Sequence, residues 1–365
     1  GTSFQSQGAR FDNESGGVAE LRRGTTFVNN AEFSNYAGAT VRVLQDAILE
    51  TAGQYSSSAS ILAGQYIQEA GANTEVDGGV LRTRDRGAIL NQGAIVLSGN
   101  GLLDNGNYVL NGASGTILVM SGSRITQGSG GLLGGRFENE GHLTVAGTMT
   151  GGSLTTTGRL IVAAGGAVET DELAIEGGHV TIQGRVGFDP SGPAGPLIPV
   201  SMSGGLLDGS GFINGDLFLS GSGPAFSSGP CSAAPNGIAC FTPGNSPGSM
   251  TIAGMLAMGA GSILELEITR DAQGLLAFDT VSAHGMRFEA GSLIRVLLDP
   301  SVGTLSGPLQ LLTCTGLESE CSFLGEVLVE GGTAGLEFLE SGFSVVDVTA
   351  VPEPSQFALL LAGFC

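Results

Sequence analysis

The sequence contains no tryptophan, and aromatic residues make up only 6% of its 365 positions. Charged residues are also scarce, at 13%, whereas hydrophobic residues reach 41%. Intrinsic disorder requires the opposite balance, low hydrophobicity with high charge density, so a disordered chain is excluded. Collagen is excluded because the 63 glycines keep no three-residue period and prolines number only 13. A glycine-rich chain that still has a core indicates many short strands and tight turns.

Basic residues are few as well: 14 stand against 34 acidic residues, which gives a formal net charge of −20. Such a surface repels phosphate groups, so nucleic acids are excluded as partners. A solvated acidic surface is the simplest interpretation, and weak Ca²⁺ association with carboxylate-bearing turns is the alternative. Because no spaced aspartate motif of the EF-hand kind occurs, no metal ligand is predicted.

Helical periodicity is missing between Val18 and Gly187, where no stretch keeps it for three turns. This region has the pattern of short strands, alternating or continuously apolar, separated by turns that carry Gly, Asn and Ser. Examples are residues 25–28, 39–43, 94–97, 116–119, 143–145 and 159–162. The pattern predicts an all-β fold.

Several turns share one pattern, in which an asparagine stands two positions after an apolar residue and is followed closely by a small one. Asn29, Asn91 and Asn139 lie in such turns, and Asn111 and Asn214 lie in shorter versions. Asparagine hydrogen-bonds the local backbone and tolerates left-handed conformations, and a small residue lets coils stack closely. The repetition predicts an elongated parallel β-helix, or β-solenoid. A chain of β-hairpins is the alternative, because Asn-Gly also favours hairpins.

Nine prolines cluster between Gly187 and Pro247. Proline removes a ladder donor, so this window is predicted to form loops or interruptions of the coil. The predicted organisation is therefore β-solenoid rungs over 1–187, a Pro/Gly-rich loop region over 188–247, and a β-rich continuation or cap of the solenoid over 248–350.

Four of the five cysteines form two close pairs, Cys231 with Cys240 and Cys314 with Cys321. A zinc site needs shorter spacing and further His or Cys neighbours. Disulfides that staple surface loops in an oxidising compartment are the favoured interpretation. Cys365 receives no role.

No catalytic constellation is evident. Glycoside hydrolysis needs two carboxylates that converge on one bond, whereas Glu138 and Glu140 are expected to share a solvated strand face. His142, His179 and His284 are predicted to be surface imidazoles, and no Gly-x-Ser-x-Gly elbow stands between a strand and a helix. The sequence therefore predicts a protein without catalytic residues or cofactors.

Three segments of the C-terminal third carry a resemblance. Residues 241–254 include Pro-Gly-Asn-Ser-Pro-Gly, residues 261–268 read Gly-Ser-Ile-Leu-Glu-Leu-Glu-Ile, and residues 278–285 begin Phe-Asp-Thr-Val. They resemble the "PGxSPGxLxIxG", "GSxLxxEI" and "FDxVxxxG" elements of autotransporter-like passenger regions and of PEP-CTERM proteins. The resemblance implies an autotransporter-passenger-like β-solenoid.

A fourth segment, Val351-Pro352-Glu353-Pro354-Ser355 followed by an apolar run, resembles the start of a PEP-CTERM sorting signal. In that family the Pro-Glu-Pro box precedes one membrane helix and a basic end, and an exosortase processes it in bacteria that make exopolysaccharide. The apolar run here is about half the roughly twenty residues that a spanning helix needs, and no Arg or Lys follows. Residues 351–365 are expected to be a truncated form of this signal, and an interfacial or core segment is the alternative.

These features together predict a secreted or cell-surface structural or adhesive protein of the extracellular matrix. Residues 1–16 are polar and show no signal-peptide core. The expected partners are an exosortase-type enzyme, exopolysaccharide, and further copies of the chain, because open solenoid ends favour head-to-tail filaments. The alternative is an exopolysaccharide-binding or polysaccharide-degrading β-helix protein.

Overall fold

The computed structural model describes residues 2–6, 10–52, 64–84, 87–128, 135–188, 198–223, 231, 237–244, 247–317, 320–339 and 342–351. The chain divides into two compact units, Gly1–Ser201 and Met202–Cys365. Within the described ranges the named elements are β-strands and the 3₁₀ turn η2 (Pro300–Val302). The all-β prediction is confirmed.

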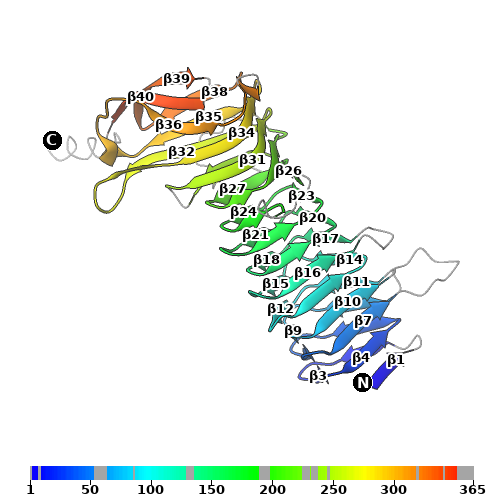
Figure 1. Cartoon of the computed structure of the whole chain (residues 1–365). Helices are drawn as coiled ribbons and strands as arrows, with labels where there is room; N and C mark the ends of the chain where they lie inside the picture. Colours follow the sequence, from blue (N-terminus) through cyan, green and yellow to red (C-terminus); the bar gives the residue numbers. More distant parts are fainter. Residues whose placement is uncertain are drawn as a thin grey trace. The chain divides into compact units, whose positions relative to one another are not determined.

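The first unit is built from strands that recur in groups of three (Figure 1). The strands are β1 (Thr2–Ser6), β2 (Phe11–Asn13), β3 (Val18–Leu21), β4 (Thr25–Asn29), β5 (Glu32–Asn35), β6 (Thr40–Val43), β7 (Ile48–Ala52), β8 (Gln65–Gln68), β9 (Asn73–Asp77), β10 (Val80–Arg84), β11 (Ala88–Asn91), β12 (Ala94–Ser98), β13 (Leu102–Asn105), β14 (Tyr108–Asn111), β15 (Thr116–Val119), β16 (Arg124–Gln127), β17 (Arg136–Asn139), β18 (His142–Val145), β19 (Thr148–Thr150), β20 (Ser153–Thr156), β21 (Arg159–Val162), β22 (Ala167–Glu169), β23 (Glu172–Ile175), β24 (His179–Ile182) and β25 (Arg185–Val186), with β26 (Ile198–Met202) at the boundary.

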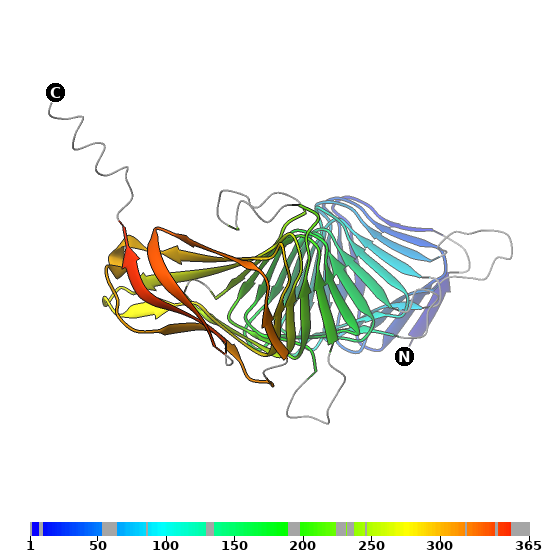
Figure 2. The same ribbon diagram turned by 90° about the horizontal axis from the view of Figure 1, so that it is seen from above.

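From β1 to β22, each strand pairs in parallel with the strand three places later, so that three strands make one rung of a coil. Figure 2 shows these strands stacked side by side. Leu49, Leu81, Leu103 and Ile125 occupy the same position in consecutive rungs and are fully buried. Burial of such a side chain contributes about 1.5–3 kcal/mol. The β-solenoid prediction is confirmed, and the hairpin alternative is wrong for these strands because their pairing is parallel.

A row of buried amide side chains, named here the amide ladder, lies where the second strand of each rung ends. Asn91 Nδ2 donates to Asn111 Oδ1 over 2.7 Å, and Asn111 Nδ2 donates to Asn139 Oδ1 over 2.8 Å. Asn111 Nδ2 also donates to the His142 carbonyl oxygen, 3.1 Å away in the next rung. The members of the ladder are Asn13, Asn35, Gln68, Asn91, Asn111 and Asn139, each at most 6% exposed. Each amide therefore ties one rung to the next.

This arrangement changes the reason for asparagine at these corners. Left-handed backbone was one expected reason, yet the described non-glycine residues with positive φ are Asp46, Asn100 and Asp347. Local bonding does occur, since Asn91 Oδ1 accepts the Gly93 N–H over 3.2 Å. A Cβ on Gly93 would lie only 2.4 Å from a carbonyl oxygen of the preceding rung. Asparagine therefore supplies bonds between rungs, and the small residue permits close stacking.

The second unit has longer strands. They are β27 (Gly205–Gly209), β28 (Phe212–Ile213), β29 (Gly215–Leu219), β30 (Ala239–Pro243), β31 (Ser249–Met258), β32 (Ser262–Arg270), β33 (Leu276–Phe278), β34 (Thr280–Phe288), β35 (Leu293–Leu298), β36 (Leu309–Cys314), β37 (Cys321–Phe323), β38 (Glu326–Glu330), β39 (Gly332–Leu339) and β40 (Gly342–Ala350). One parallel sheet runs β27, β30, β32, β35 and β38. In the other, β31 pairs in parallel with β34, and β34 pairs with β36 and β37.

Antiparallel pairing enters only in this second unit among the described strands. β40 pairs antiparallel with β36 and β39, and β33 folds back on β32. The window 188–247, predicted as loops, in fact contains several strands. Pro199 lies in β26 with its ring exposed, and Pro243 ends β30. Prolines at an outward position and at a strand end leave the rest of each strand free to pair.

Candidate functional site

The first disulfide, Cys231–Cys240, covers an apolar cluster on one face of the parallel sheet in the second unit. Cys240 lies on β30, and the cluster includes Ile238, Ile263 and Leu293. Register aligns Cys240 with Ile263 and Ile263 with Leu293. The bonded pair is thus largely buried rather than placed in an open surface loop.

Beside this disulfide lies a buried ion pair that the sequence analysis missed. Arg295 is 1% exposed, and its Nη1 lies 3.2 Å from Glu265 Oε2. The same carboxylate oxygen accepts the Cys231 N–H over 3.1 Å, and Glu330 lies 3.3 Å from Arg295 Nε. Removing one partner of such a pair leaves a buried charge uncompensated. The ion pair therefore positions the disulfide segment.

Three of the recognised sequence elements, 241–254, 261–268 and 278–285, meet at Asp279. This residue is 3% exposed, and its two carboxylate oxygens accept the Gly248 N–H over 2.7 Å and the Glu267 N–H over 2.8 Å. Burial raises the pKa of the Asp279 carboxyl to about 6, although the two backbone N–H donors act in the opposite direction. The aspartate of "FDxVxxxG" therefore fixes the turn of "PGxSPG", which is a structural role.

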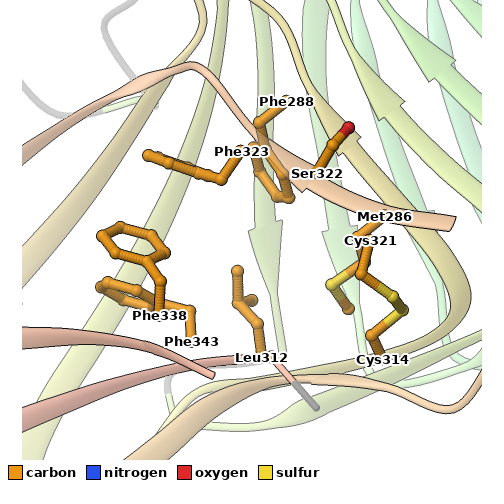
Figure 3. A pocket seen from close by; sticks show the side chains of 10 residues that line it. Met286, Phe288, Leu312, Cys314, Cys321, Ser322, Phe323, Phe338 and Phe343 are labelled. Carbon is orange, nitrogen blue, oxygen red and sulfur yellow. A yellow bond between two sulfur atoms is a disulfide. The ribbon is translucent and has the colours of Figure 1, made fainter. Parts of the chain in front are cut away.

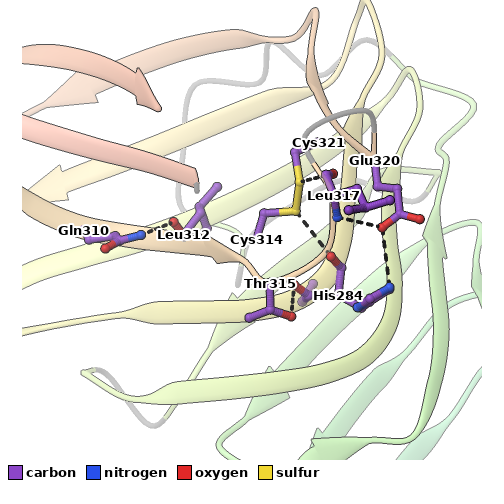
Figure 4. Close-up of a disulfide and its surroundings, with 9 residues drawn as sticks. His284, Gln310, Leu312, Cys314, Thr315, Leu317, Glu320 and Cys321 are labelled. Atoms are coloured by element: carbon purple, nitrogen blue, oxygen red, sulfur yellow. Dashed lines mark hydrogen bonds and ion pairs between the residues drawn. A yellow bond between two sulfur atoms is a disulfide. The ribbon is translucent and has the colours of Figure 1, made fainter. Parts of the chain in front are cut away.

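The second disulfide, Cys314–Cys321, closes a short loop between β36 and β37 (Figure 4). The loop is anchored to β34, because Gly316 N–H donates to the His284 carbonyl oxygen over 2.7 Å. His284 Nε2 also lies 3.4 Å from Glu320 Oε2 at the surface. His284 is therefore an exposed imidazole, paired with one carboxylate.

An apolar pocket of about 450 Å³ lies against this disulfide (Figure 3). Phe288, Phe323, Phe338 and Phe343 form a continuous aromatic row, with ring centroids 4.4–5.3 Å apart. The remaining lining residues are Met286, Leu312, Cys314, Cys321, Ser322 and Gly342. Because this lining carries no charged side chain, the pocket suits an uncharged apolar group.

The other candidate residues lie apart from this region of the chain. Glu138 is ion-paired with Arg136 at 2.5 Å and accepts the Tyr108 hydroxyl over 2.7 Å, whereas Glu140 is exposed. Burial raises the pKa of Tyr108, and the bond to Glu138 raises it further. The described geometry thus commits Glu138 to a structural contact.

His142 is exposed on β18, and His179 on β24 lies 3.4 Å from a threonine hydroxyl. Within the described ranges, no three or more His, Cys, Asp or Glu side chains lie close enough to share a metal ion. No described helix has the length and apolarity needed to cross a membrane. Of the predicted sorting motif, Val351 is half exposed after β40, and Pro352, Glu353, Pro354 and Ser355 lie outside the described residues.

A sequence signal for the ion pair does exist. Glu265 and Arg295 are charged residues with apolar neighbours on both sides in the sequence, and such an interruption suggests a buried partner. Their pairing depends on the register of β32 and β35, which places them directly opposite.

No family model matches the chain, and no curated protein matches it. Among solved structures, it is similar to the crystal structure of a TibC-catalysed hyper-glycosylated TibA fragment, with 14% identity and a TM-score of 0.35. The alignment covers 90% of this chain and 95% of that one.

Proposed function

We propose that this protein is an exported, non-catalytic β-solenoid that acts at the cell surface or in the extracellular matrix as a structural or adhesive element. The observation that carries the proposal is the ordered display of outward side chains by stacked rungs. Arg82 Nε donates to Asp104 Oδ2 over 2.8 Å, and Thr126 Oγ1 donates to Asp104 Oδ1 over 3.1 Å. Rungs spaced about 4.8 Å apart present such rows as a regular surface.

Export is supported by the two disulfides, because structural disulfides persist in oxidising compartments. The terminal Pro-Glu-Pro resemblance supports processing by an exosortase-type enzyme. Mass-spectrometric mapping of thiols in protein recovered from outside the cell tests this point. Export predicts that both pairs are oxidised, and free thiols at all four positions would refute it.

Matrix association is tested with the polysaccharide of the producing bacterium. Retention of the protein without cleavage supports adhesion to the matrix, and release of shorter chains supports the polysaccharide-degrading alternative instead. If the protein is neither retained nor cleaves the polysaccharide, a purely structural role is supported.

Self-assembly is the most specific part of the proposal. Electron microscopy at high protein concentration tests it, because self-assembly predicts filaments.

A further inference from the structure

The parallel sheet of the second unit ends at β38, whose outer edge has no partner among the described strands. β38 pairs in parallel with β35 along one side. The opposite side therefore offers backbone N–H and C=O groups to an additional strand.

This edge carries neither lysine nor proline, and its only charged residues are two glutamates. Edge strands are commonly blunted by lysine or proline. Residues 309–351 contain neither of these, and they contain no arginine. Leu324, just before β38, is 74% exposed, and Leu328 within it is 39% exposed. The edge is thus chemically open to a partner with apolar side chains.

The charged residues of β38 favour a partner strand of opposite charge. The strand reads Glu-Val-Leu-Val-Glu, and Val327 and Val329 lie beside the buried Ile294 and Val296. Alternation places Glu326, Leu328 and Glu330 on the other face. Because Arg295 is shared between Glu330 and Glu265, this face keeps an excess of carboxylates.

Two other occupants fit this pattern poorly. Pairing with β38 of a second copy would bring glutamates opposite glutamates, and like charges opposite each other destabilise a sheet. Residues 352–365 of the chain itself contain no arginine or lysine. We propose that the β38 edge binds an extended segment of another protein with two basic residues flanking three apolar ones.

Binding of short peptides to the full chain tests this inference. The probe is an end-blocked Arg-Val-Leu-Val-Arg peptide, and the control is Glu-Val-Leu-Val-Glu, which repeats the sequence of β38. Isothermal titration calorimetry is expected to show binding of the basic peptide but not of the control peptide. The affinity for the basic peptide should fall as salt is added. Hydrogen exchange is expected to slow at the amides of Val327 and Val329, which point away from β35.

Two charge-reversal variants locate the site. Glu326→Lys is expected to weaken binding of the basic peptide at least about tenfold. Glu337→Lys makes the same charge change on the exposed surface of β39 and is expected to stay within about twofold of wild type. Circular dichroism spectra that match wild type establish that both variants are folded.

Several results would overturn the inference. The first is that the basic peptide does not bind the wild-type chain. The second is that both peptides bind equally well, and the third is that both variants lose the same affinity for the basic peptide. Slow exchange at Val327 and Val329 without peptide would assign the edge to the chain itself. Filaments that form in wild type and disappear in Glu326→Lys would assign it to a second copy. Export and matrix association are measured separately, so these results leave the proposed function untouched.

Discussion

Replacing Asn111 with aspartate tests whether the amide ladder holds consecutive rungs together. The substitution keeps the size of the side chain but exchanges the donating Nδ2 for an oxygen. That atom would then face two acceptors, Asn139 Oδ1 at 2.8 Å and the His142 carbonyl oxygen at 3.1 Å. Asn111 is fully buried, so water cannot replace the lost bonds.

The magnitude follows from these contacts. Two donated bonds disappear, and each buried acceptor left unpaired costs about 1–3 kcal/mol. A carboxylate buried against other oxygens adds a desolvation cost. Asn111→Asp is therefore expected to lower the free energy of unfolding by at least about 2 kcal/mol at pH 7.

The assay is urea denaturation followed by far-UV circular dichroism, at pH 7 and at pH 4. Asn73→Asp is the matched control, because it makes the same charge change at an exposed position of β9 and is expected to cost less than about 0.5 kcal/mol. Burial raises the pKa of the carboxyl introduced at position 111, so acidification restores its neutral form and one O–H donor. The loss at position 111 should therefore shrink at pH 4. Equal losses in both variants, or a loss at 111 that ignores pH, would refute the role of the ladder.

Three further changes test other contacts in the same denaturation assay. Burial raises the pKa of Asp279 in the folded chain to about 6, above the ordinary aspartate value of 3.8. The protonated side chain therefore stabilises the fold fully below pH 4, and this stabilisation is lost as pH rises through 6. Between pH 4 and pH 6 the free energy of unfolding of wild type should fall by up to about 3 kcal/mol relative to that of Asp279→Asn. Parallel pH profiles of unfolding free energy for the two proteins would contradict this. Replacing Cys231 and Cys240 together by serine should lower the free energy of unfolding by about 3 kcal/mol. If the urea midpoint of wild type is the same under reducing and oxidising conditions, this prediction is wrong. Gly141→Ala would place a Cβ 2.3 Å from a carbonyl oxygen and should lower the free energy of unfolding by about 1–3 kcal/mol. In the control Gly259→Ala, the nearest atom to the new Cβ lies at 3.5 Å, so the free energy of unfolding should hardly change.

Much of the coil could be predicted because its pattern is local. Alternating apolar residues specify which side of a strand is buried, and rungs repeat the same positions, as Leu81 and Leu103 illustrate. Asn91 and Asn139 were recognised as equivalent from sequence, and the structure places both in the amide ladder. Gln68 was not recognised as a member, because a longer amide breaks the sequence pattern while filling the same corner.

The candidate site was less predictable. Spacing in the sequence suggested both disulfides, since a local pair needs only a short loop. The aromatic pocket escaped notice because Phe288, Phe323 and Phe343 come from separate strands with no shared pattern. The partner of Asp279 likewise required the turn at Gly248 to be placed beside it.

The sequence by itself determined the strand-rich class, the inward and outward faces of each strand, and the close cysteine pairs, because these depend on neighbours within a few residues. Tertiary structure decided the parallel stacking and the register that brings Glu265 to Arg295. It also decided that β38 ends a sheet. Such features depend on which distant strands align, and a one-residue shift would move every side chain to the other face.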